Sequence, residues 1–187
     1  MRRWTVAVLA VALAVPPVLA ASLADVTLPD EVVISGKTLK LNGMGLREKM
    51  WVDVYVAGFY LEQPTAEAAT AIASQQIKRV VMHFLTNKAT KSKMDNAWTE
   101  GFEGNSPDQL AALKGRLDTF KGFFGNMKDG DRVEITMEPG KGTVVSFNGT
   151  EKGAVEGDDF AQALLRVWLG NRPPSEDLKA GMLGGSR

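Results

Sequence analysis

Arg47 stands out for the chemistry that its position could support. It lies between a glycine-rich segment, residues 42–45, which we expect to form a turn, and an apolar segment, residues 51–62. A guanidinium at the start of a largely apolar strand can bind a carboxylate or an enolate, because its planar fork matches two oxygens. The alternative is a surface charge paired with Glu48 or with solvent. The residues alone leave both interpretations open.

Other reactive side chains favour structural roles. His83 is the only histidine and the chain has no cysteine, so thiol chemistry and clustered histidine or cysteine metal sites are excluded. The chain has two close acidic pairs. Asp129 and Asp131 lie in a segment of turn-forming residues, and Asp158 and Asp159 lie at an expected helix start, where acidic groups favour the helix dipole. We therefore expect no metal and no other cofactor.

The basic residues give no indication of a polyanionic partner. The chain has 22 basic and 22 acidic residues, so net charge suggests neither nucleic acid nor an anionic membrane surface. Lys88, Lys91 and Lys93 lie close together in the sequence, and such a group is usually a solvated helix face.

The N-terminus has the pattern of a secretory signal peptide. Arg2 and Arg3 precede an apolar run, residues 6–15, which is followed by Pro16 and Pro17 and by small residues. A membrane-spanning helix would need roughly 20 apolar residues. We predict a signal peptide at residues 1–20 and a single domain at residues 21–187, exported to the periplasm or secreted, without stable membrane insertion.

The elements that must position these residues follow from periodicity. Residues 51–62 predict a central strand covered on both faces, with Trp51 and Tyr55 on the same face. Asn148 followed by Gly149 predicts a tight hairpin. Strands are further expected within 31–45, 77–86 and 131–155, and helices within 64–76, 87–105, 106–126, 157–171 and 173–185. Because strands and helices segregate, we predict an α+β fold with helices on one face of a mainly antiparallel sheet.

Three segments carry a resemblance to a known family. They are "LNGMGLREKMWVDVYVAGFYLE" (41–62), "MHFLTNKATKSKMDNAWTEGF" (82–102) and "GAVEGDDFAQALLRVWLGNRPPSEDLKAGMLG" (153–184). The chain resembles the chalcone isomerase-like family, in particular its exported bacterial branch. The resemblance implies an open-faced β-sandwich, in which helices pack on a curved antiparallel sheet and a ligand cleft lies between them.

The resemblance also implies a ligand site. The family's cleft arginine matches Arg47, its strand threonine matches Tyr55, and its helix tyrosine, lysine and asparagine match Thr90, Lys93 and Ala97. Plant members close a chalcone into a flavanone, whereas related members bind fatty acids through an arginine and a tyrosine. In this chain, three of the enzymes' polar positions carry a different type of residue. A catalyst needs donors placed where charge develops in the transition state, so these changes favour binding over chalcone isomerase activity.

Three functions follow as hypotheses. The leading one is an exported, noncatalytic protein that binds a small amphipathic or anionic molecule such as a fatty acid. The alternative is an isomerase or intramolecular lyase acting on a chalcone-like or other conjugated carbonyl compound. In the third, Trp51, Phe59 and Trp98 fill the cleft and the domain acts through partners; the sequence identifies no protein partner. Open volume beside Arg47 would separate the third hypothesis from the others.

Overall fold

A computed structural model describes residues 19–185, so most of the predicted signal peptide lies outside the described residues. The strands are β1 Ala20–Leu23, β2 Val26–Pro29, β3 Glu31–Ile34, β4 Lys37–Lys49, β5 Val52–Leu61, β6 Lys78–Phe84, β7 Arg132–Glu138, β8 Gly142–Phe147 and β9 Thr150–Val155. The helices are α1 Ala68–Ala73, α2 Lys91–Asn105, α3 Leu110–Gly122, α4 Asp158–Leu169 and α5 Glu176–Met182, with a 3₁₀ turn at Pro107–Gln109.

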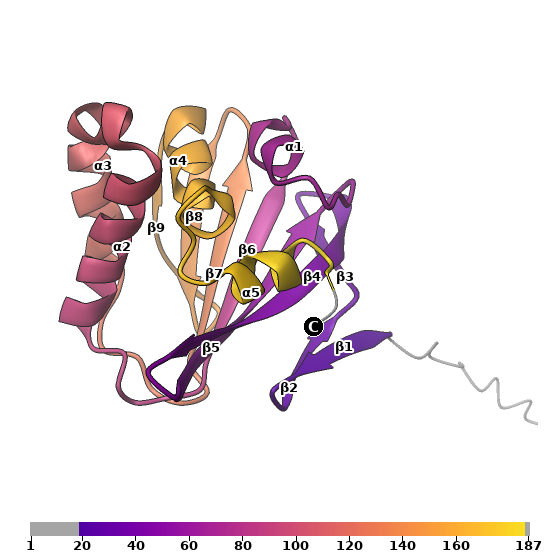
Figure 1. The fold of residues 1–187 in the computed structure, drawn as a ribbon. Helices are drawn as coiled ribbons and strands as arrows, with labels where there is room; N and C mark the ends of the chain where they lie inside the picture. Colours follow the sequence, from indigo (N-terminus) through magenta and orange to yellow (C-terminus); the bar gives the residue numbers. More distant parts are fainter. Residues whose placement is uncertain (1–18, 186–187) are drawn as a thin grey trace, which may run out of the picture.

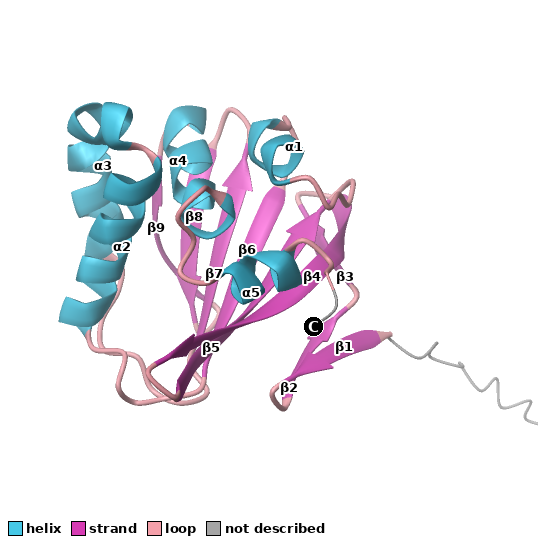
Figure 2. Ribbon diagram, viewed as in Figure 1, coloured by secondary structure: helices cyan, strands magenta, loops and turns pink. Residues whose placement is uncertain are grey.

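Seven strands form one antiparallel sheet in the order β3-β4-β5-β6-β7-β8-β9, and β1 pairs with β2 as a separate hairpin. The helices cover one face of this sheet, with α5 lying across β4 and β5 (Figures 1 and 2). The predicted α+β fold, a curved antiparallel sheet packed by helices, is confirmed. Among the described residues, no helix has the length and apolar character needed to cross a bilayer.

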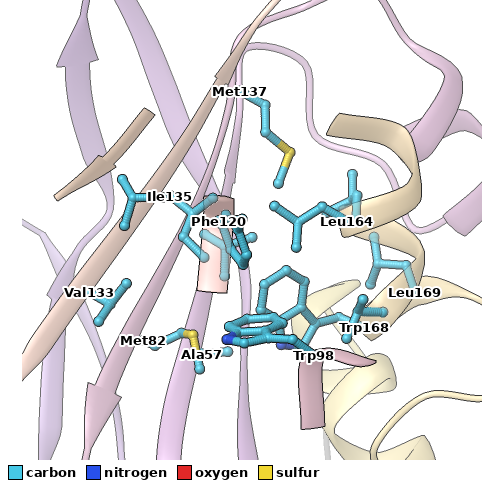
Figure 3. Close-up of a cluster of buried hydrophobic side chains, with 14 of the residues drawn as sticks. Ala57, Met82, Trp98, Phe120, Val133, Ile135, Met137, Leu164, Trp168 and Leu169 are labelled. Atoms are coloured by element: carbon cyan, nitrogen blue, oxygen red, sulfur yellow. The ribbon is translucent and has the colours of Figure 1, made fainter. Parts of the chain in front are cut away.

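Two hydrophobic clusters lie on opposite faces of the sheet. The larger, which includes Phe59, packs the helices against the sheet around Phe120, Leu164 and Trp168 (Figure 3). The smaller lies between the sheet and the β1–β2 hairpin, where Leu28 is almost fully buried. Strand β5 therefore has apolar cover on both faces, as its sequence predicts.

The glycine-rich segment is not the turn that the sequence suggested. Residues 42–45 lie inside β4, and the chain reverses at Met50 and Trp51 instead. Trp51, expected on the strand with Tyr55, lies in this two-residue turn with 95% of its surface exposed. The prediction failed because alternation along residues 51–62 does not show where β5 begins.

The glycines of β4 have a packing role instead. A Cβ atom on Gly43 would lie 2.1 Å from the carbonyl oxygen of Gly181, and one on Gly45 would lie 2.3 Å from that of Leu178. Both contacts are with the backbone of α5, which cannot move as a flexible side chain can. Because alternate residues of a strand share a face, these glycines let α5 lie directly on β4.

This contact predicts that Gly45→Ala destabilises the fold by about 1–3 kcal/mol, the usual cost of overpacking. The measurement is the free energy of unfolding from a urea titration. Gly115→Ala is the matched control, since no atom lies within 4 Å of the added carbon. In the interior of α3 this substitution should stabilise by about 0.5–1 kcal/mol. Equal unfolding midpoints for Gly45→Ala and wild type would contradict the packing role.

Candidate functional site

A cavity of about 720 Å³ opens between the sheet and the helix layer. Its walls come from β4, β5 and β6 on the sheet side, from α2 and α4 on the helix side, and from residues 172–174, which lead towards α5. This volume falls within the range of small-molecule sites, about 300–1,000 Å³. The open space adjoins Arg47, so the hypothesis that side chains fill the cleft is not supported.

Arg47 is held at the cleft by the backbone. Its Nη1 donates to the carbonyl oxygens of Pro174, at 2.7 Å, and Glu48, at 2.8 Å. Among the residues described, Nε and Nη2 have no partner, and these two atoms form the edge that can bind a carboxylate side-on. Arg47 is half-buried, and within the described residues it contacts the backbone of Glu48 and forms no ion pair with its carboxylate, one of the two partners that the surface-charge interpretation offered.

A β-bulge brings Tyr55 and its neighbour to the cleft side. Arg47 pairs with Tyr55 and Glu48 with Asp53, which leaves Val54 as the extra residue on β5. A bulge interrupts the alternation of a strand, so Val52, Val54 and Tyr55 all line the cavity. The side-chain direction of Tyr55, which the sequence did not determine, is therefore towards the helix layer.

Tyr55 is placed to act as a hydrogen-bond donor. Its hydroxyl accepts a hydrogen bond from Nε1 of Trp168 at 3.2 Å. No acceptor for the hydroxyl's own proton is found within residues 19–185. Burial raises the pKa of Tyr55 to about 12, partly offset by the Trp168 bond and by the positive charge of Arg47. The phenol is therefore neutral near pH 7, and its proton is available to a ligand.

The three predicted helix-side residues separate in the structure. Lys93 and Ala97 line the cavity, and Nζ of Lys93 donates to the carbonyl oxygen of Lys88 at 3.0 Å. Thr90 does not line the cavity; it is the N-cap of α2, and its hydroxyl accepts from the amide of Lys93. Lys91 turns away to pair with Asp95.

Sequence reasoning missed several polar groups of the cleft. Thr86 and Asn96 line it, and so does Trp98, which was expected only as a filling residue. Nε1 of Trp98 is buried without a hydrogen-bond partner, although a buried donor is normally paired. Met82, Trp98 and Trp168 lie together at one end of the buried cluster in Figure 3. The signal was present as the apolar spacing of α2, but that spacing does not distinguish a core wall from a cavity wall.

The lining carries far more positive charge than the chain as a whole. Five of its side chains are cationic and one, Glu100, is anionic. The cations are Arg47, Lys49, Lys88, Lys93 and Arg172. The described residues contain no cluster of three or more histidine, cysteine, aspartate or glutamate residues that could hold a metal ion. The arrangement suits an anionic group at the rim and an apolar body among the methionine, valine and tryptophan side chains.

Comparisons with known proteins agree with this architecture. A family model described as chalcone isomerase-like matches residues 20–184. Among solved structures, the fatty-acid binding protein AtFAP1 of Arabidopsis thaliana matches with a TM-score of 0.71 and 14% sequence identity, covering 88% of this chain and 96% of the other. At this identity the likeness shows the fold. A search of curated proteins gives no match.

The raised tyrosine pKa values predict an unusual titration. Burial also raises the pKa of Tyr60, the chain's second tyrosine, to about 12. In the folded protein, tyrosinate absorbance should therefore be absent at pH 10.0, the ordinary value, and should develop towards pH 12. Above pH 10.0 the unfolded chain loses these protons first, so the free energy of unfolding should fall as pH rises from 10.0 to about 12.

The measurements are an ultraviolet titration and unfolding curves across that range. Tyr55→Phe should remove about half of the tyrosinate signal, because two tyrosines share it. If the tyrosinate signal that Tyr55→Phe removes develops near pH 10.0 in the folded wild-type protein, the buried environment assigned to Tyr55 is contradicted.

Proposed function

The chain belongs to the chalcone isomerase-like family, and we propose that it binds a fatty acid or a similar amphipathic carboxylate in the cleft without converting it. One observation carries the proposal: the cleft lining has five cationic side chains and one anionic, although the chain as a whole is neutral. An anion is the ligand class that such a lining favours. Support for a fatty acid comes from a relative by fold, the Arabidopsis fatty-acid binding protein.

Arg47 and Tyr55 would hold the carboxylate. They are partners across β4 and β5, so their side chains leave the same face of the sheet. The free Nε and Nη2 edge of Arg47 supplies two donors in the geometry of a carboxylate. The neutral hydroxyl of Tyr55 supplies a third donor, and Lys93 adds charge from the helix side.

The acyl chain would occupy the apolar part of the cleft. Val54 and Met82 lie on the sheet side, while Met94, Trp98 and Val167 lie on the helix side. Methionine side chains adapt to irregular ligands because they are unbranched and polarisable. This lining would accommodate a flexible chain better than a single rigid ring system.

Binding without conversion is favoured by the helix-side residues. Thr90, at the position of the enzymes' tyrosine, serves as a helix cap outside the lining, and Ala97, at the asparagine position, presents only a methyl group. The cleft thereby lacks donors at two positions that the chalcone-cyclising members use. We also propose that the protein is exported, on the pattern of charged, apolar and small residues at its N-terminus.

The proposal predicts that Arg47→Ala binds palmitate roughly 10- to 100-fold more weakly than wild type, the value of a charge-assisted hydrogen bond. Isothermal titration in vesicle-free buffer measures this. The corresponding fatty alcohol has no charge, so its affinity should change little between the two proteins.

Arg116→Ala is the matched control, because Arg116 pairs with Asp159 outside the cleft. Arg47→Lys keeps the charge and loses the fork, so it should fall between wild type and Arg47→Ala. Thermal unfolding without ligand shows whether loss of the Pro174 contact disturbs the fold. Equal palmitate affinity in wild type and a folded Arg47→Ala protein would overturn the role of Arg47.

A further inference from the structure

The turn between β4 and β5 differs from the other tight turns in the described residues. Four hairpins reverse through two residues that both have positive φ. Three of these turns contain small or polar pairs: Ala24–Asp25, Ser35–Gly36 and Asn148–Gly149. The fourth is Met50–Trp51, with φ of 50° and 65°. Such turns favour asparagine and glycine, because bulky residues rarely adopt positive φ.

The side chains of this turn do not contribute to the core. Met50 is 83% exposed and Trp51 is 95% exposed. The other large exposed hydrophobic residues of residues 19–185, Leu19 and Val33, lie elsewhere and singly. Folding therefore gains nothing from a methionine and a tryptophan here, and their backbone conformation costs free energy. Met50 and Trp51 therefore form an adjacent exposed apolar pair with no role in the core.

The turn lies at the rim of the cleft. Met50 and its neighbour Lys49 both line the cavity, together with Lys88 from the loop before α2. In Figure 1 the hairpin tip extends below the start of α2, beyond the body of the sheet. A surface that meets Met50 and Trp51 would therefore also meet the mouth of the cleft.

We propose that the β4–β5 tip, defined as residues 49–52, docks the protein on a lipid membrane with its cleft mouth against the bilayer. This inference rests on the proposed function, because a fatty acid partitions into membranes and must leave one to enter the cleft. Tryptophan is the side chain most suited to the boundary between acyl chains and headgroups.

Local charge selects an anionic surface. Lys49 belongs to the tip, and Lys88 and Lys93 also line the cleft. Each lysine near an anionic bilayer adds attraction. Two carboxylates also lie on this hairpin: Glu48 and Asp53 face each other one pair further from the turn. The outermost pair, Lys49 with Val52, carries positive charge alone. The net charge of the whole chain is zero, so it does not show this local excess of lysine.

The test is cosedimentation of the full chain with vesicles of phosphatidylcholine and phosphatidylglycerol, and with phosphatidylcholine alone. Wild type should pellet with the mixed vesicles and less with the neutral ones. Trp51→Ser should partition at least about tenfold more weakly, as expected for removing one large apolar side chain from the interface. Val33→Ser, which also removes an exposed apolar side chain, should match wild type.

All proteins share the same N-terminus, so any contribution of residues 1–18 cancels between variants. Palmitate titration in vesicle-free buffer separates the two proposals, and Trp51→Ser should bind palmitate as wild type does, since Trp51 is outside the lining. Wild type that stays in the supernatant, as it would if the tip met a protein instead, would overturn membrane docking. Equal partitioning of wild type and Trp51→Ser would overturn it as well, whatever the palmitate result.

Discussion

The backbone contact between β4 and α5 is the constraint on which the rest of the structure depends. Gly43 and Gly45 leave no side chain between the strand and the helix, so the C-terminal segment lies directly on the sheet. Asn42, the extra residue of a β-bulge in β4, strengthens this contact by donating to the carbonyl oxygen of Met182 at 2.9 Å. The segment before α5 is thereby brought beside Arg47, the next residue on the same face, where Pro174 accepts its hydrogen bond.

A second constraint arises from the bulge at Val54. Regular alternation would send Val54 and Tyr55 to opposite faces, one to the helix layer and one to the β1–β2 side. The bulge puts both in the cleft, so an apolar wall and a hydroxyl donor come from consecutive residues. The Trp168 indole then fixes the hydroxyl by donating to it, which leaves the phenolic proton for a ligand. The hydrogen-bonding part and the apolar part of the site are therefore adjacent on β5, at Tyr55 and Val54.

Much of the fold could be predicted from the sequence, because its signals are local. The Asn148–Gly149 turn and the central position of β5 follow from residue type and spacing, and the structure confirms both. The turn predicted at the glycines of β4 is wrong, since glycine permits either a turn or a close approach and only the position of α5 decides between them. Trp51 was wrongly predicted to lie in the strand for a different reason: the actual turn, Met50–Trp51, contains no glycine, asparagine, aspartate or proline.

Less of the candidate site than of the fold could be predicted from the sequence. Of the residues that the family resemblance points to, Arg47, Tyr55, Lys93 and Ala97 line the cavity, whereas Thr90 caps α2, and their ligand-binding role stays a prediction. The unpaired Nε1 of Trp98 and the Pro174 carbonyl could not be predicted, because both depend on tertiary packing between distant segments. No periodicity within one element carries that information.

A crystal structure of the protein with bound palmitate tests carboxylate binding by Arg47 and Tyr55 most directly. The carboxylate should lie within about 3 Å of Nε or Nη2 of Arg47 and of the Tyr55 hydroxyl, with the acyl chain running between Met82 and Trp98. A carboxylate at the opposite end of the cleft, or palmitate bound outside the cavity, would contradict it.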